Sequence, residues 1–167
     1  MYYFGLLEER KKDKFKTLPN TYSNSCTSRL AMFLSTLAKG RVLDPCCGVA
    51  TIALQALDNN LSVTLNDINF KIAKQAEENL RHFGYSEKVT SCDIASLSGY
   101  FDTVILDMPY DHFTKCSDED KTKILKNAKR LGKKLLVLST DDLSFDNDFT
   151  KLKICKNNFT RYIYITN

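Results

Sequence analysis

This sequence of 167 residues has no apolar run long enough to cross a membrane. A transmembrane helix needs about 20 consecutive apolar residues, and charged residues interrupt every apolar stretch here well before that length. The opening letters MYYFGLLEERKKDKFK also lack the apolar core of a signal peptide, because charges follow the short apolar stretch at once. These absences predict a cytoplasmic protein with no membrane partner.

Histidine is scarce, with two residues, and none of the six cysteines forms a C-x-x-C pair. Zinc sites draw their ligands from such clusters of cysteine and histidine. We therefore expect no metal site and interpret the cysteines as reduced thiols. A zinc site assembled from cysteines distant in the sequence is the alternative.

The chain also lacks internal repeats, low-complexity tracts and any linker-like stretch. Its content of 43% hydrophobic and 26% charged residues is the balance of a soluble globular protein. We expect a single domain over residues 1–167, in which 1–40 form an amino-terminal extension and a helix.

Hydrophobic periodicity predicts an alternation of helices and strands. Helices are expected at 27–38, 49–57, 69–83 and 118–131, and strands at 41–44, 61–67, 88–93, 101–107 and 133–140. Such an alternation is typical of an α/β protein, with a mostly parallel sheet and helices on both faces. Two alternating runs in 149–167, separated by KNN, predict a carboxyl-terminal antiparallel hairpin.

Four consecutive predicted strands end on an aspartate: Asp44, Asp67, Asp93 and Asp107. One acid after a strand is ordinary turn or capping chemistry. Four acids would converge at the carboxyl edge of the sheet, where ligands bind in doubly wound folds. Asp67 also follows Gly48 by 19 residues, about the spacing of a ribose-binding acid in dinucleotide-type folds.

Two stretches carry a family resemblance. VLDPCCGVATIALQAL resembles the first motif of S-adenosylmethionine (SAM)-dependent methyltransferases, and LDMPY is similar to their fourth motif, [D/N/S]-P-P-[Y/F], which marks enzymes that methylate exocyclic amino groups. TSRLAMFLSTLAKG and FTRYIYI resemble the helix before the first strand and the last strand of the tRNA guanine-N2 methyltransferases. The resemblance implies a Rossmann-like class I methyltransferase sheet of seven strands.

The same resemblance implies SAM as the cofactor. Asp67 would bind the ribose hydroxyls, Ile68 would pack on the adenine face, and Asp93 would accept from the adenine amino group. The methionine end would lie against Asp44 and the following turn of Pro45, Cys46, Cys47, Gly48 and Ala50. Core packing is the alternative for Ile68, and the two thiols are expected to act as small apolar groups rather than nucleophiles.

The fourth motif supplies the expected catalytic residues. Asp107 and the main-chain carbonyl of Met108 would accept the two hydrogens of the target amine. Pro109 would fix the bend, and Tyr110 would stack on the extruded base. A surface tyrosine after a turn is the alternative for Tyr110.

Two positions depart from the family pattern. Ala50 replaces the second glycine of G-x-G, and we expect close approach of the cofactor there if the backbone is not at positive φ. Met108 replaces the first proline of the fourth motif, which keeps the carbonyl but makes the bend less rigid.

RNA, and tRNA in particular, is the expected substrate by resemblance. Members of that family usually carry an amino-terminal THUMP domain, and only 40 residues precede Arg41. RNA would then bind the basic clusters 10–16 and 121–134, or a protein partner or second copy would supply the surface. Solvated helix faces are the other interpretation of these clusters. Two other functions stay open: an adenine-N6 methyltransferase acting on DNA or RNA, and a non-catalytic scaffold of the same fold.

Overall fold

The computed structural model describes residues 14–22, 26–109, 116–143, 149–156 and 159–166. Its first half contains α1 (Ser28–Leu37), β1 (Arg41–Asp44), α2 (Thr51–Asp58), β2 (Ser62–Asn66), α3 (Phe70–His82) and β3 (Val89–Thr90). The second half contains the 3-10 helix η1 (Ile94–Ser96), β4 (Phe101–Asp107), α4 (Asp118–Leu131), β5 (Gly132–Ser139), β6 (Phe149–Lys156) and β7 (Phe159–Thr166). Every helix and strand expected from the periodicity is present, with ends that differ by a few residues.

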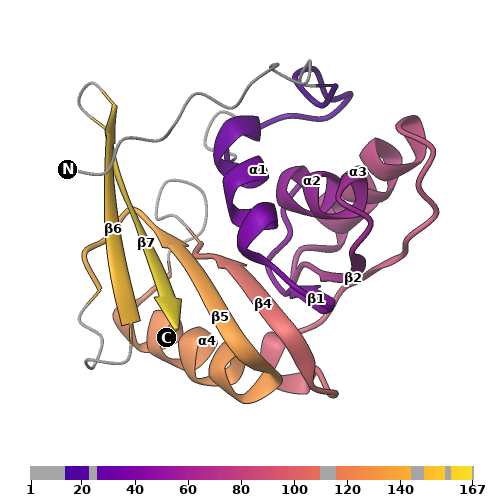
Figure 1. Cartoon of the computed structure of the whole chain (residues 1–167). Coiled ribbons are helices and arrows are strands. Elements are labelled where there is room, and N and C mark those ends of the chain that lie inside the picture. The colour runs from indigo at the N-terminus through magenta and orange to yellow at the C-terminus, as the bar shows by residue number, and fades with distance from the viewer. Residues whose placement is uncertain (1–13, 23–25, 110–115, 144–148, 157–158, 167) are drawn as a thin grey trace.

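The strands form one seven-stranded sheet in the order β3-β2-β1-β4-β5-β7-β6 (Figure 1). Strands β1 to β5 pair in parallel, whereas β7 inserts antiparallel between β5 and β6. The predicted mostly parallel sheet with an antiparallel carboxyl-terminal hairpin is therefore confirmed. Strand order reverses between β1 and β4, so the carboxyl ends of these two strands flank the place where such sheets bind ligands.

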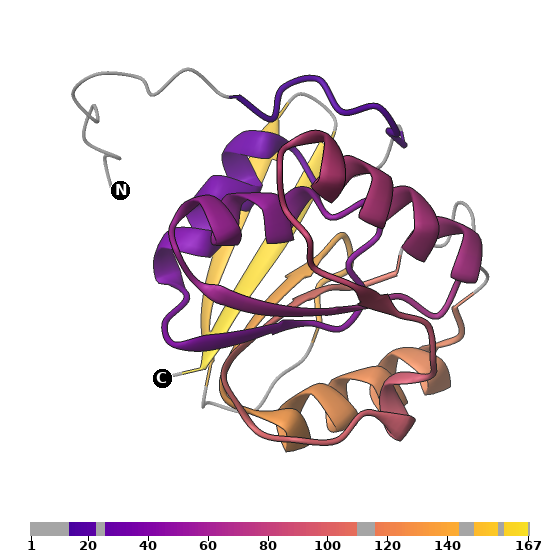
Figure 2. The ribbon, with the colours of Figure 1, turned by 90° about the vertical axis from the view of Figure 1, so that its right-hand side faces the viewer.

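Helices cover both faces of the sheet. Helices α1, α2 and α3 lie on one face and α4 lies on the other (Figures 1 and 2). Strand β4 contributes to both cores because its side chains alternate: Ile105 packs into the core under α1 and α2, and Val104 and Leu106 pack into the core under α4. Asp107 follows Leu106 and so lies on the α1 and α2 face.

Local sequence explains where the helices begin. Helix α4 starts at a capping box in which Ser117 Oγ accepts from the Asp120 N–H at 3.1 Å and Asp120 Oδ2 accepts from the Ser117 N–H at 3.2 Å. Its bounds are those expected from the sequence. Helix α3 begins after Asn69, whose side chain accepts from the N–H groups of Lys71 and Ile72.

Helix α1 ends earlier than its terminal glycine suggested. It stops at Leu37, and Gly40 lies in the turn that leads into β1 with a φ of 63°. A Cβ on Gly40 would come within 2.3 Å of Asp102 Oδ2, the same oxygen that accepts from the Arg41 N–H at 2.7 Å. Glycine at this position therefore lets β1 enter the sheet beside β4 rather than ending the helix.

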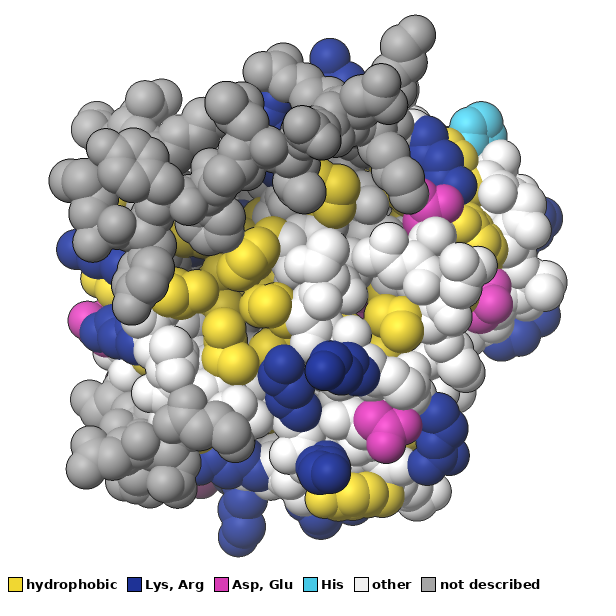
Figure 3. All heavy atoms as spheres, viewed as in Figure 1, with side chains coloured by type: hydrophobic (Ala, Val, Ile, Leu, Met, Phe, Trp, Pro, Cys, Tyr) yellow, Lys and Arg dark blue, Asp and Glu magenta, His cyan; other side chains and the backbone are white. Residues whose placement is uncertain are grey.

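The outer part of the α1 face is apolar at the surface. Leu152 of β6 and Ile165 of β7 are partly buried against the first core, and Met32 and Ile154 are exposed. Figure 3 shows apolar side chains on the surface between α1 and the hairpin strands. Within the described part of the chain, no helix combines the length and apolar character that a membrane span requires.

Candidate active site

The strand-end acids do meet at one edge of the sheet. Asp44 pairs in register with Leu65, next to the end of β2, and Asp107 pairs with Leu138 at the end of β5. Asp44 is 1% exposed, and Asp67 and Asp107 are half-buried. This edge therefore holds three carboxylates with limited access to water.

Asp44 is the most unusual of the three. Neither of its carboxylate oxygens makes a hydrogen bond of normal geometry with a described residue, although the Cys46 N–H lies near enough to influence its pKa. Burial raises the pKa of Asp44 well above its ordinary value, the charges of Asp107 and Asp67 raise it further, and the Cys46 N–H opposes the rise. An ionised carboxyl without a partner is unfavourable in a protein interior, so this position favours a cationic ligand.

The turn after β1 is held open by contacts from β2 and α3. The Cys47 N–H donates to the Asn66 carbonyl at 2.9 Å, and the Gly48 N–H donates to Asp67 Oδ2 at 3.0 Å. Asn79 Nδ2 donates to the Val49 carbonyl at 2.9 Å. Gly48 has a φ of 53°, and a Cβ there would meet nothing within 4 Å, which leaves room for a ligand to approach its backbone.

Ala50 does not meet the condition that was set for this turn. Close approach of the cofactor was expected if the backbone was not at positive φ, but Ala50 adopts a left-handed conformation with φ 68° and ψ 25°. The conformation costs a non-glycine residue about 1–2 kcal/mol. Ala50 is fully buried in the core under α1 and α2 and does not line the pocket described below. The methyl group therefore strains the turn without obstructing a ligand.

Asp67 connects the second strand to this turn. Besides its bond to Gly48, its Oδ1 accepts from the Asn69 N–H at 2.9 Å. Burial raises the pKa of Asp67, while the bonds from Asn69 and Gly48 lower it. Each carboxylate oxygen can still accept a second hydrogen bond, so the side chain can anchor the turn and receive a hydroxyl.

The start of α3 exposes two large apolar side chains beside Asp67. Ile68 is 69% exposed and Phe70 is 63% exposed. The alternative that Ile68 packs in the core is therefore wrong. Asp93 is exposed and accepts from the Ala95 N–H at 2.8 Å as the cap of η1, so it lies at this edge but carries a local structural bond.

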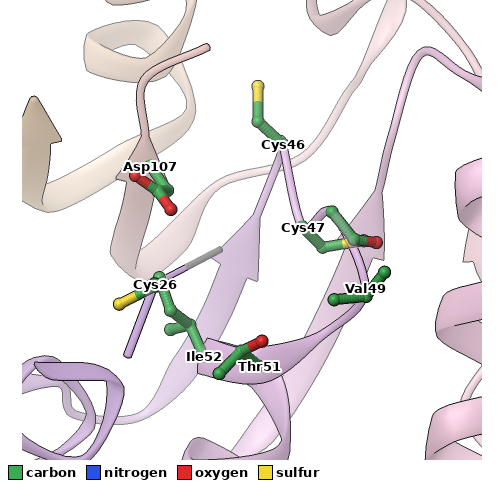
Figure 4. Close-up of a pocket in the computed structure, with 8 residues that line it drawn as sticks. Cys26, Cys46, Cys47, Val49, Thr51, Ile52 and Asp107 are labelled. Carbon is green, nitrogen blue, oxygen red and sulfur yellow. The ribbon is translucent and has the colours of Figure 1, made fainter. Parts of the chain in front are cut away.

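A shallow pocket joins the turn to the end of β4 (Figure 4). Four segments line it: the segment that leads into α1, the turn after β1, the first turn of α2 and the end of β4. These contribute Cys26, Cys46, Cys47, Gly48, Val49, Thr51, Ile52 and Asp107. In Figure 4 the Asp107 carboxylate lies on the opposite side of the pocket from Val49 and Thr51, with Cys46 and Cys26 above and below the gap.

The three pocket thiols remain protonated at neutral pH. Burial is the main cause that raises the pKa values of Cys26, Cys46 and Cys47 well above the ordinary range, and nearby carboxylates add to it. A thiol is nucleophilic as its thiolate. These shifts support the expectation that Cys46 and Cys47 act as small apolar groups.

The end of β4 explains the methionine that replaces a proline. The Met108 N–H donates to the Leu138 carbonyl at 2.9 Å, a bond that proline has no N–H to make. Its side chain is 2% exposed in the core under α4. Met108 therefore fixes the strand end through β5, and Pro109 follows directly. Tyr110 lies outside the described residues.

Two buried asparagines that the sequence did not single out build the edge. Asn66 Nδ2 donates to the carbonyls of Pro45 and Cys92 at 3.0 Å each, and its Oδ1 accepts from Thr90 Oγ1 at 3.0 Å. Asn66 thereby joins the ends of β1, β2 and β3. Asn79 of α3 plays the same part for the turn. An asparagine inside an apolar strand, as in LSVTLND, is the signal that could have identified Asn66.

The order of strands, the inserted antiparallel β7 and the ligand edge between β1 and β4 define the class I methyltransferase fold. The methyltransferase small domain family profile matches residues 12–141. The chain belongs to this family. The resemblance first seen in the β1 and β4 motifs is thus confirmed over most of the chain.

Two curated relatives resemble the chain more distantly. It is 28% identical to the tRNA (guanine(10)-N2)-dimethyltransferase of Methanothermobacter thermautotrophicus over 65% of this chain and 34% of that protein. It is 27% identical to the ribosomal RNA small subunit methyltransferase C of Cronobacter sakazakii over 79% of this chain and 42% of that protein. The chain therefore spans less than half the length of these relatives.

A solved structure supports the assignment of fold. TrmN from Thermus thermophilus superposes with a TM-score of 0.69 at 20% sequence identity, over 86% of this chain and 49% of that one. At this identity the likeness concerns the arrangement of the backbone.

Proposed function

We propose that this chain transfers a methyl group from SAM to an exocyclic amino group of an RNA base, with guanine N2 of tRNA as the target. The observation that carries the proposal is the meeting, at one edge of the sheet, of the buried Asp44, which has no hydrogen-bond partner among the described residues, and a β4 end of the amino-methylating type that lines the pocket. Membership of the methyltransferase small domain family and the similarity to a tRNA guanine-N2 dimethyltransferase support it.

The residues of the β1 and β2 ends fit SAM. Asp44, buried without a partner, suits the ammonium of the methionine end, and the open space over Gly48 suits close approach to the backbone. Asp67 would receive the ribose hydroxyls, and the exposed Ile68 would cover the adenine. SAM would supply a methyl group made electrophilic by its sulfonium, whose positive charge suits an edge with three carboxylates.

The end of β4 would act on the acceptor. The lone pair of an exocyclic amine is delocalised into the base, which makes the nitrogen a poor nucleophile. Asp107 and the Met108 carbonyl would accept its two hydrogens and direct the lone pair at the methyl group. Acceptors that are positioned before the reaction would stabilise the charge that develops on nitrogen. By analogy, the loss of one oxyanion-hole donor costs roughly 2.7–4 kcal/mol. After transfer, the positively charged methylated amine would lose one of its two protons, and the Asp107 carboxylate would accept that proton.

The basic run 121–134 is a weaker candidate for the RNA-binding surface than its charge alone suggests. It follows α4 from the site edge, where β4 ends, to the opposite edge, where β5 begins. At the site end Lys121 pairs with Asp141 at 2.6 Å, and Lys123 pairs with Glu119 at 2.9 Å. Lys153 of β6 offers a better candidate, because it is exposed and its partner in register, Tyr162, also pairs with the last residue of β5.

Methylation of RNA with tritiated SAM tests the function. Total RNA from cells that lack the protein is incubated with it, digested, and the labelled nucleoside identified. We expect label in N2-methylguanosine or N2,N2-dimethylguanosine. Label in N6-methyladenosine would replace the guanine assignment by the adenine one. Absence of label, with SAM bound in calorimetry, would contradict transfer to RNA, and absence of both would favour the scaffold.

A further inference from the structure

Strand β7 carries a buried cation that the two methyltransferase motifs do not include. Arg161 is 6% exposed although arginine is rarely buried without a partner charge. It lies in the strand inserted between β5 and β6, far along the chain from Asp107. Its position in the sheet shows what it faces.

The register of the sheet places Arg161 near the acceptor end of the site, which is the end of β4 at Asp107, where the target amine would bind. Asp107 pairs with Leu138, and Leu138 pairs with Ile163, so these three residues form one row across β4, β5 and β7. Leu138 and Ile163 both pack in the core under α1 and α2. Side chains alternate along a strand, so Arg161 shares that face with Ile163 and lies two residues closer to the carboxyl edge. Asp107 and Arg161 therefore occupy the same face and the same edge.

Cys26 provides an independent indication that the two groups are close. This thiol lines the pocket with Asp107 (Figure 4). After burial, the largest influences on its pKa are the Asp107 carboxylate, which raises it, and the Arg161 guanidinium, which lowers it. The charges of Asp107 and Arg161 therefore both act on one buried side chain, with opposite effects on its pKa.

We propose that Arg161 is a positioning residue for the transfer, whose guanidinium keeps the Asp107 carboxylate ionised and directed at the target amine. This inference rests on the proposed function for its consequence in catalysis, although the electrostatic link between the two residues does not. Without a cation, an acid so close to other carboxylates would be driven toward its neutral form. A neutral Asp107 would offer a weaker acceptor and no negative charge for the methylated amine.

Acids, thiols and one cation lie around Asp107 in the part of the chain that the structure describes. The Asp107 charge acts on Asp44, Cys26 and Cys46, Asp67 acts on Asp44 from the same edge, and the Arg161 charge acts on Cys26. The acids disfavour ionisation of Asp107 and the thiols are neutral. Arg161 is thus the positive charge in this set. Its removal should raise the pKa of Asp107.

Titration of Asp107 itself tests the link without any need for activity. In protein labelled with 13C at aspartate carboxyl groups, Asp107→Asn identifies the Asp107 signal. Its titration midpoint should rise by at least about one pH unit in Arg161→Gln, because a nearby opposite charge lowers a carboxyl pKa by about 1–3 units. Arg161→Lys should restore most of the difference. Arg81→Gln, which removes an exposed charge at the end of α3, should leave the midpoint unchanged.

Methyl transfer then tests the consequence. In single turnovers at saturating SAM, Arg161→Gln should lose at least tenfold in rate at neutral pH. The acidic limb of its pH–rate profile should move to higher pH. Arg161→Lys should keep the wild-type limb, and both variants should bind SAM as the wild type does. An unchanged Asp107 midpoint in folded Arg161→Gln would overturn the inference. If the midpoint moves but wild-type protein methylates no RNA, the proposed function fails and the electrostatic link stands.

Discussion

The two halves of the candidate site are built in different ways. The cofactor half, at the ends of β1 and β2, comes mainly from one continuous stretch, 44–70, joined by hydrogen bonds through Asn66 and Asp67, with Asp93 as the proposed addition after β3. The acceptor half comes from three distant segments, with Cys26 before α1, Asp107 on β4 and Arg161 on β7. A continuous stretch produces a motif that a reader can find in the sequence. A site assembled across the sheet requires the topology.

The halves also differ in whether a positive charge lies near their buried carboxylate. Asp44 in the cofactor half is buried with no hydrogen-bond partner among the described residues, which is unfavourable until a cation arrives. Asp107 in the acceptor half shares its face with Arg161, which supplies a positive charge before any ligand binds. We therefore expect changes in the first half to alter binding of SAM and changes in the second half to alter the rate of transfer.

The largest effect should follow removal of the acceptor carboxylate. Asp107→Ala should lose at least about a hundredfold in single-turnover rate, because it removes a hydrogen-bond acceptor used in the transition state. Asp107→Asn keeps one acceptor oxygen without the charge and should retain partial activity. Wild-type turnover by Asp107→Ala at saturating SAM would contradict the amino-methyltransferase assignment.

Replacing Asp44 should separate stability from binding. Asp44→Asn should raise the free energy of unfolding of the ligand-free protein at neutral pH by about 1–3 kcal/mol, because a buried carboxylate without partners is removed. SAM affinity should fall about tenfold to a hundredfold, since hydrogen bonds to charged groups contribute roughly 1.5–3 kcal/mol. Urea unfolding and calorimetry measure the two quantities, and a variant that loses stability would contradict this account of Asp44.

The raised pKa of Asp44 also predicts the direction of a pH effect. A carboxyl whose pKa is higher in the folded state favours folding below its unfolded value, 3.8, and that contribution is lost as pH rises through the folded value. Wild-type protein should therefore lose stability relative to Asp44→Asn as pH rises from about 4. A stability difference that is constant with pH would show that Asp44 does not titrate with folding.

A smaller effect is expected on RNA affinity, which should depend more on a lysine near the site edge of the sheet than on one at the opposite edge. Lys153→Glu, near the site edge, should weaken RNA binding several-fold and reduce its salt dependence. Lys133→Glu makes the same change of charge at the opposite edge, at the start of β5, and should have less effect. Gel-shift titrations at two salt concentrations measure both, and an equal or larger effect of Lys133→Glu would move the RNA surface away from the site.

The smallest effect is expected at Ala50. Ala50→Gly relieves left-handed strain of about 1–2 kcal/mol, but it removes a buried methyl group, worth about 0.8 kcal/mol, and adds freedom to the unfolded chain. The net change in stability should stay within about 1 kcal/mol. SAM affinity should not change, because the methyl group packs in the core. A large gain in affinity by calorimetry would show that Ala50 does obstruct the cofactor.

The sequence predicted the fold well because its periodic segments are long and regular. Helix α4 was predicted with its observed bounds, since an acidic first turn and a following glycine mark both ends. The hairpin was predicted because two alternating runs flank a turn. The end of α1 was predicted to within one residue, but the positive φ of Gly40 serves the approach of β1 to Asp102 rather than the helix terminus.

Site prediction was limited by contacts between distant segments. Asp44 and Asp67 were proposed as site residues because each comes at the end of an apolar strand. Arg161 was not singled out, because both faces of FTRYIYI carry large apolar or aromatic residues, and only the insertion of β7 beside β5 shows that it lies at the edge of Asp107. The backbone conformation at Ala50 could not be predicted, because the turn is shaped by hydrogen bonds from α3 and from the end of β2 as well as by its own residues.

Calorimetric titration of SAM into the wild type and two variants tests most directly whether the site has a cofactor half and a separate acceptor half. Wild-type protein should bind one SAM with micromolar-class affinity. Asp67→Ala should bind at least about tenfold more weakly, because it loses charge-assisted hydrogen bonds of roughly 1.5–3 kcal/mol, whereas Asp107→Ala should bind as the wild type does. If Asp67→Ala titrates like wild type, or Asp107→Ala loses SAM binding, the cofactor does not lie where this account places it.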